Sequence, residues 1–175
     1  TGSTPYIPEV IGASQTNVIT AHDVLKGAHT GDTVVIIDTQ GNPPGPTVAE
    51  FLADQGKKVE IITGLKWVGS EIKPAAVWHP LYERLLQKGV TLTPMTGVSR
   101  IGEDFIEVYN VVSPTITRII ESVDTVVFAA GGIANNTLYS KIKGKIPEIY
   151  PVGDCVQPRG IEIATYHAHK QAMEI

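Results

Sequence analysis

Residues 33–62 read TVVIIDTQGNPPGPTVAEFLADQGKKVEII, which predicts a strand, a turn, a helix and a second strand in succession. The run 33–37 is β-branched and apolar without alternation, as expected of a parallel strand that is covered on both faces. Helix 46–55 begins at a proline, which suits the first helical position, and is followed by a glycine that can end it. Strand 58–62 then follows by a right-handed crossover, which predicts a doubly wound sheet of the dinucleotide-binding type.

The rest of the chain extends this pattern on both sides. Residues 1–15 are expected to be irregular, and the pattern change after residue 98 indicates an antiparallel hairpin. The predicted elements are a strand at 18–20 with a helical turn up to Gly27, a helix at 80–88, a strand at 90–92, hairpin strands at 105–112 and 115–121, a returning strand at 123–130, a short strand at 149–152 and a terminal helix at 161–175. The predicted fold class is therefore α/β and Rossmann-like, a three-layer parallel sheet of the FAD/NAD(P)-binding type with a small antiparallel β-meander.

Composition and charge exclude several classes of function. The 175 residues are 42% hydrophobic and 18% charged, which is typical of a globular chain. A net charge of −4 without any basic run argues against nucleic-acid binding. No apolar stretch reaches the roughly 18 residues of a membrane span and no signal peptide opens the chain, so we expect no membrane contact and a cytoplasmic location. Cys155 is the only cysteine, so a disulfide, a Cys-x-x-Cys pair and an iron–sulfur site are excluded within this segment.

The turn after the first strand of the 33–62 unit is where a nicotinamide dinucleotide would bind. Such a turn normally reads Gly-x-Gly-x-x-Gly, because glycines permit the tight turn and the close approach of the pyrophosphate. Here it reads DTQGNPPGP over 38–46, so the glycines are wrongly spaced, three prolines lack an N–H, and Asp38 adds a negative charge. No acidic residue that would hold a ribose follows the second strand, which ends Ile62-Thr63-Gly64. We therefore predict a retained scaffold that does not bind NAD(P)H.

A second candidate nucleotide site lies near the C-terminus, where an apolar segment runs into Gly153-Asp154. Gly153 permits the close approach of a ligand, and Asp154 can accept hydrogen bonds from sugar hydroxyls. The helix expected to follow offers free N–H groups and the positive end of its dipole. Arg159 stands just before that helix, where it can meet a phosphate or form a surface salt bridge. A Gly-Asp pair also makes ordinary turns, so the motif alone does not decide between a site and a turn.

The order of three segments resembles that of disulfide-reductase-like flavoproteins. In such proteins a Thr-Gly segment leads out of the flavin domain, a strand ending in glycine leads back, and a Gly-Asp turn closes the flavin site. This chain has Thr1-Gly2, the strand 124–130 followed by Gly131-Gly132, and Gly153-Asp154 in the same order. The resemblance implies a cofactor site formed by Thr1, Gly2, Gly131, Gly132, Gly153, Asp154 and Arg159, without catalytic residues or metal ligands.

Four further segments narrow the resemblance to one family. They are Thr20-Ala-His-Asp-Val-Leu-Lys-Gly27, Val48-Ala-Glu-Phe-Leu-Ala53, Asn136-Thr-Leu-Tyr139 and Gly153-Asp-Cys-Val-Gln-Pro-Arg159. Together they resemble the C-terminal region of the trimethylamine dehydrogenase, histamine dehydrogenase and 2,4-dienoyl-CoA reductase family of Old-Yellow-Enzyme-like iron–sulfur flavoproteins, over nearly the whole chain. The resemblance implies ADP or FAD at the site of the flavin-type domain, with FMN and a 4Fe-4S cluster on a barrel domain outside this segment.

The degenerate turn at 38–46 separates the branches of this family. The reductase branch takes electrons from NADPH, whereas the amine dehydrogenase branch oxidises an amine at FMN and does not need a nicotinamide site. We therefore expect a region of an amine dehydrogenase acting on a trimethylamine-, dimethylamine- or histamine-like substrate. Two alternatives remain: the NAD(P)H-binding module of a 2,4-dienoyl-CoA-reductase-like enoate reductase, and a non-catalytic scaffold for oligomer or electron-transfer-partner contacts.

The resemblance also implies a domain plan. Residues 1–15 and 126–175 would be parts of a flavin- or ADP-binding host domain, and 16–125 an inserted NAD(P)-binding-like domain. Because the chain begins and ends inside expected elements, we expect a fragment that is not catalytic alone and whose first partner is the barrel domain of the same polypeptide. An electron-transfer flavoprotein and further copies in a homo-oligomer are the other expected partners.

Overall fold

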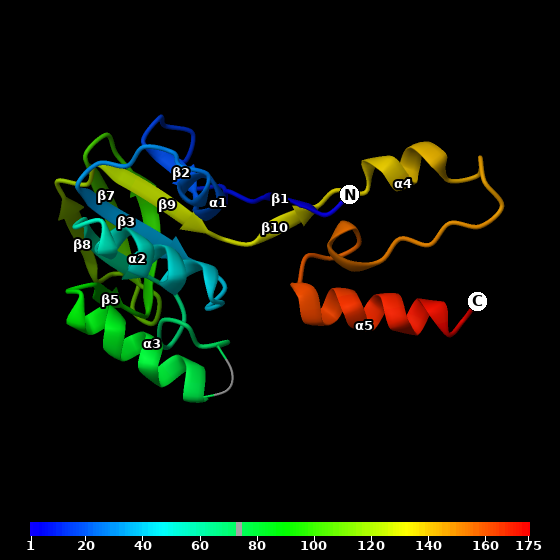
Figure 1. The fold of residues 1–175 in the computed structure, drawn as a ribbon. Coiled ribbons are helices and arrows are strands. Elements are labelled where there is room, and N and C mark those ends of the chain that lie inside the picture. Colours follow the sequence, from blue (N-terminus) through cyan, green and yellow to red (C-terminus); the bar gives the residue numbers. More distant parts are fainter. Residues whose placement is uncertain (73–74) are drawn as a thin grey trace. The chain divides into compact units, whose positions relative to one another are not determined.

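A computed structural model describes residues 1–72 and 75–175 of the chain. The chain divides into two compact units, a larger one over Ile7–Ala130 and a smaller one that joins Thr1–Tyr6 to Gly131–Ile175 (Figure 1). The predicted boundaries at residues 15 and 125 differ from this division. Residues 126–130 belong to the larger unit because their strand pairs inside its sheet. The assignment of the two units to a host and an inserted nucleotide-binding domain stays a prediction.

The larger unit is built on a five-stranded parallel sheet, which confirms the predicted α/β class. Its strands, in spatial order, are β2 (Val18–Thr20), β9 (Thr125–Ala129), β3 (Thr33–Asp38), β4 (Lys58–Ile62) and β5 (Thr91–Thr93). β3 lies between β9 and β4 and pairs parallel with both. The continuous apolar run of β3 is therefore the sequence of a central strand.

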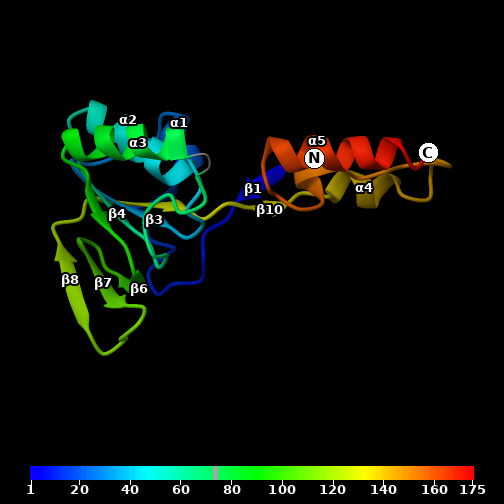
Figure 2. The ribbon, with the colours of Figure 1, turned by 90° about the horizontal axis from the view of Figure 1, so that it is seen from below.

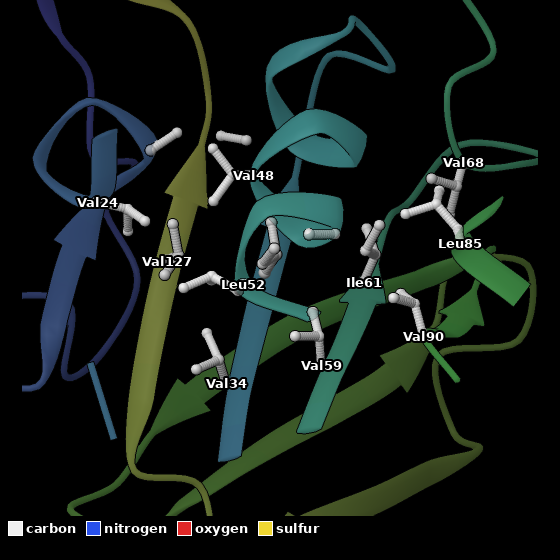
Figure 3. Packing of buried hydrophobic residues seen from close by; sticks show 14 of the residues in the cluster. Val24, Val34, Val48, Leu52, Val59, Ile61, Val68, Leu85, Val90 and Val127 are labelled. Carbon is white, nitrogen blue, oxygen red and sulfur yellow. The ribbon is translucent and has the colours of Figure 1, made fainter. Parts of the chain in front are cut away.

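Helices cover one face of this sheet. They are α1 (Ala21–Leu25), α2 (Pro44–Asp54) and α3 (Ala75–Gln87), and Figure 2 shows them on one side. Val34 and Ile36 of β3 point to this side, where they join a buried cluster with Val48 and Leu52 of α2 (Figure 3). Burying side chains of this size contributes about 1.5–3 kcal/mol each to folding.

An antiparallel meander covers the opposite face. It consists of β6 (Thr96–Ile101), β7 (Phe105–Asn110) and β8 (Thr117–Glu121). Val35 and Ile37, the alternate residues of β3, form a second buried cluster with Ile106 and Val108 of β7. The expected meander is thus present with a third strand, β6. The sheet is covered by helices on one face and by strands on the other, and so is not wound on both faces by helices as expected.

Two helices begin earlier than predicted. α2 starts at Pro44, and within it Phe51 is 42% exposed while Leu52 is 1% exposed. α3 starts at Ala75, so Pro80 lies inside the helix and not at its entry. Trp78 accounts for the upstream turn: its ring stacks on Tyr82 at 4.3 Å between centroids, and its indole N–H donates to the carbonyl of Val68 at 3.3 Å.

The smaller unit consists of short elements. They are β1 (Ser3–Pro5), β10 (Gly132–Ala134), α4 (Thr137–Ile142), a 3₁₀ turn at Gly153–Cys155 and α5 (Ile161–Ala172). The ribbon of β1 with β10 was not expected, and the predicted strand at 149–152 is wrong, because this segment pairs with no other strand in the described structure. The terminal helix is confirmed. Over the described residues, no helix is both long and apolar enough to cross a membrane.

Candidate functional site

Asp38 stands at the end of β3, where the degenerate turn begins. Its carboxylate is buried, with the residue 1% exposed. Oδ1 accepts hydrogen bonds from the backbone N–H of Gln40 at 3.0 Å and of Gly41 at 2.9 Å. Its Cγ lies 3.0 Å from the point that a Cβ on Gly45, in the first turn of α2, would occupy. The carboxylate therefore fills the space between the strand end and the helix start.

A second loop, residues 63–72, packs over this turn. Glu71 donates its N–H to the carbonyl of Gly41 at 3.0 Å. A Cβ on Gly41 would lie 2.5 Å from Ser70 Oγ and 2.8 Å from Leu65 Cδ1, and φ at Gly41 is +66°. Gly41 is thus required by the neighbouring loop and by its own left-handed backbone. This loop follows β4 directly, which is the position where a dinucleotide-binding fold carries the acidic residue that binds a ribose.

The burial of Asp38 has an electrostatic consequence. Loss of hydration raises the pKa of its carboxyl above the ordinary value, while the N–H groups of Gly41 and Gln40 oppose that rise. Its second oxygen, Oδ2, is buried without a hydrogen-bond partner, and so is Ser70 Oγ. Two buried oxygens without partners in one region are unusual, because such groups are nearly always paired.

The Gly-Asp turn of the smaller unit is built as a close-packed corner. Gly153 is buried with φ at +71°, and a Cβ there would lie 3.1 Å from the Cβ of Ala164 in α5. Asp154 is half-buried, and its Oδ1 accepts the backbone N–H of Arg159 at 3.2 Å. The turn therefore places Asp154 beside the start of α5. Oδ2 of Asp154 makes no hydrogen bond within the described structure.

α5 begins without a side-chain cap. Its N-cap residue is Gly160, with φ at +85°, so no side chain satisfies the first N–H groups of the helix. A free helix start next to a carboxylate with one open oxygen fits the ribose and phosphate groups of a nucleotide. Glu162 in the first turn opposes an anion there, and Arg159, which is exposed, can offset it. The residues present therefore fit the sugar and phosphate part of a nucleotide.

The two-stranded sheet of β1 and β10 brings the predicted site residues Gly2, Gly131 and Gly132 close to one another. Gly2 accepts the N–H of Asn135 at 2.9 Å, and Gly131 accepts the N–H of Tyr6 at 3.1 Å, so the expected outgoing and returning segments lie side by side. Gly132 is tightly enclosed, since a Cβ there would lie 3.0 Å from both Ser3 Oγ and the carbonyl oxygen of Thr4. All seven predicted site residues belong to the smaller unit. Their binding role stays a prediction.

Sequence reasoning located Asp38 by its charge but missed Ser70 and the loop that carries it. No pattern in residues 63–72 signals a cover over a turn more than twenty residues upstream. Outside residues 73–74, no group of histidine, cysteine, aspartate or glutamate side chains could hold a metal ion.

Comparison with known proteins places the chain among oxidoreductases. No protein-family profile matches it. It is 26% identical to a metal reductase of Desulforamulus reducens, with 99% of the chain and 30% of the relative covered. It is also 26% identical to the N,N-dimethylglycine/sarcosine dehydrogenase of Chromohalobacter salexigens, with 96% and 30% covered. The histamine dehydrogenase of Rhizobium sp. 4-9 superposes with a TM-score of 0.88 at 26% identity, over 100% of the chain and 30% of that structure.

The resemblance to the trimethylamine and histamine dehydrogenase family is confirmed. The chain spans about 30% of the length of the relatives that it matches, so it corresponds to one region of the larger oxidoreductases of this family. A 2-naphthoyl-CoA reductase superposes with a TM-score of 0.85 at 24% identity, over 99% of the chain and 26% of that structure. At that identity the likeness shows the fold alone.

Proposed function

We propose that the chain is the C-terminal nucleotide-binding-like region of an amine-oxidising iron–sulfur flavoprotein. The smaller unit would contribute to a site for ADP or FAD, and the larger unit would serve as a scaffold without NAD(P)H. FMN, the 4Fe-4S cluster and the amine would bind a barrel domain outside this segment. The relatives named as dehydrogenases of histamine and of N,N-dimethylglycine or sarcosine support an amine substrate.

One observation favours the amine dehydrogenase branch of the family over the reductase branch. The turn after β3 is filled by the carboxylate of Asp38 and covered by the loop of Ser70. A nicotinamide dinucleotide needs this turn to bind its pyrophosphate. A reductase that takes electrons from NADPH at this place is therefore disfavoured.

Asp154 provides the test of the adenine-nucleotide site. In the intact enzyme, Asp154→Ala should lower the affinity for ADP or FAD about tenfold or more, since a hydrogen bond to a charged group is worth about 1.5–3 kcal/mol. Nucleotide content after purification and calorimetric titration with ADP, FAD, NADH and NADPH would measure this. We expect an adenine nucleotide to bind the wild type, and neither nicotinamide dinucleotide to bind at 38–46.

Asp104→Ala is the matched control, because Asp104 is an exposed aspartate in the meander of the larger unit. It should leave nucleotide content unchanged. Equal occupancy in the wild type and in Asp154→Ala would show that Asp154 only orders the turn through Arg159. Saturable NADH binding that depends on residues 38–46 would overturn the branch assignment.

A reductase remains the second candidate, because one relative is named a metal reductase. Such an enzyme needs an electron donor other than a dinucleotide bound at 38–46. Reduction of the intact enzyme's flavin by an amine, without NAD(P)H, would favour the dehydrogenase. Reduction by NADPH alone would favour the reductase.

A further inference from the structure

The start of α2 attracts negative charge, yet its own first turn supplies none. Its N-cap is Pro43, which makes no side-chain cap, and no acidic residue lies in the first turn. The positive end of the dipole of this eleven-residue helix favours an anion here. Among the first three residues of the helix, only Gly45 has an N–H to donate, because Pro44 and Pro46 have none. In nucleotide-binding folds of this topology, that anion is a phosphate of the ligand.

Asp38 supplies the anion from within the chain. It reaches the helix start from the end of β3, with Oδ2 3.2 Å from the Cβ position of Gly45. Two consecutive backbone N–H groups, from Gln40 and Gly41, converge on Oδ1. Successive N–H groups that point at one acceptor form a nest, which is a common way to bind an oxyanion.

Among residues 1–72 and 75–175, which the structure describes, no side-chain cation pairs with this carboxylate. The ion pairs of the described residues lie elsewhere, and Asp38 is in none of them. The buried Oδ2, which lacks a partner, shows that the surroundings were not built to satisfy an aspartate on both oxygens. Within the described residues, the groups that compensate the buried charge are the backbone N–H groups of Gln40 and Gly41, as they would be for a bound phosphate.

We propose that Asp38 is a built-in substitute for a phosphate, which occupies the anion site of the fold and closes it to external ligands. When the carboxylate is removed, the same site would accept a small inorganic oxyanion. It would not accept a dinucleotide, because Pro43, Pro44 and Pro46 offer no N–H to a second phosphate. This inference does not depend on which nucleotide the smaller unit binds.

The test is a titration of the ¹⁵N-labelled 175-residue chain with sodium phosphate at constant ionic strength. The amide signals of Gln40 and Gly41 report on the nest. In the wild type they should not shift saturably. In Asp38→Ala, they should shift saturably together with those of the first turn of α2, with an affinity for phosphate at least tenfold above that of the wild type.

Ser70→Ala is the matched control, because it removes the other unpartnered oxygen and keeps the carboxylate. It should remain closed to phosphate. Asp38→Ser is measured in parallel in case Asp38→Ala does not fold. Saturable phosphate binding at Gln40 and Gly41 in the wild type would overturn the proposal whether or not a variant folds. A folded Asp38 variant that does not respond to phosphate would overturn it as well.

Discussion

Asp38 and Asp154 show how burial changes what one residue type can do in this chain. Oδ1 of Asp38 accepts two backbone N–H groups ahead of α2, and Oδ1 of Asp154 accepts one ahead of α5. Asp38 is almost fully buried and has lost its hydration, whereas Asp154 is half-buried and keeps access to solvent. A buried carboxylate closes a site, and a half-buried one can still serve a ligand. The two aspartates differ in how deeply they are buried, and the residues next to each of them in the sequence do not reveal this difference.

The pH dependence of stability should reveal the burial of Asp38. Its folded-state pKa is raised above the ordinary 3.8 by loss of hydration. The stability it contributes is therefore fully present below the unfolded pKa, and is lost as pH rises through the folded pKa. The unfolding free energy of Asp38→Asn relative to the wild type should thus increase from pH 3 upward and level off above the folded pKa. Urea unfolding at a series of pH values would measure it.

Asp32→Asn is the control for this dependence. The Lys57 ammonium, by hydrogen bond and charge, holds the pKa of the Asp32 carboxyl below its ordinary value. Any contribution of Asp32 is therefore present above the unfolded pKa and lost as pH falls, which is the opposite sign. A constant difference between Asp38→Asn and the wild type across pH would contradict the burial of a charged carboxylate.

Among the secondary-structure elements, those with a clear hydrophobic pattern were predicted from the sequence, and the others were not. β3 and β4 were expected within one residue of their observed ends, because β-branched runs in a central parallel strand leave a clear pattern. β1 and β10 are only three residues long, and their pairing rests on backbone bonds between distant segments. The start of α3 was missed because a proline usually opens a helix, and the packing of Trp78 could not be seen in the sequence.

The candidate site was predictable to a similar extent. The wrong glycine spacing and the charge of Asp38 are local facts, so the failure of the nicotinamide turn could be predicted. The cover formed by residues 63–72 arises from tertiary packing between two loops. For the smaller unit, the pairing of β1 with β10 was not predicted, because it rests on backbone bonds between segments far apart in the sequence.

Two neighbouring residues of α2 test the packing of this element. Leu52 is 1% exposed within the helix-side cluster, and Phe51 is 42% exposed. Leu52→Ala should lower the unfolding free energy by about 2–5 kcal/mol, because it removes buried contacts and leaves a cavity. Phe51→Ala, the control, should cost much less. Thermal or urea unfolding would measure both, and equal losses would show that Phe51 is as buried as Leu52.

For the whole molecule, apolar burial is divided unequally between the two units. The buried hydrophobic residues of the described structure run from Val18 to Ala130, all in the larger unit. In the smaller unit, α4 and α5 contain no buried residue. Ile161 and Met173 of this unit are 84% and 76% exposed. The smaller unit therefore lacks the apolar core that stabilises an independent domain.

Hydrogen exchange of the 175-residue chain should show this inequality directly. Amides of β3 and β9 open only with the core, whereas amides of α5 can open locally at little cost because the helix buries no side chain. We expect exchange in α5 to be at least about a hundredfold faster, equivalent to roughly 3 kcal/mol in opening free energy. Equal protection in β9 and α5 would mean that the smaller unit draws stability from contacts beyond its own side chains. In the intact enzyme, protection of α5 should rise if further parts of the polypeptide cover Ile161 and Met173, which would place the nucleotide site of Asp154 within a completed domain.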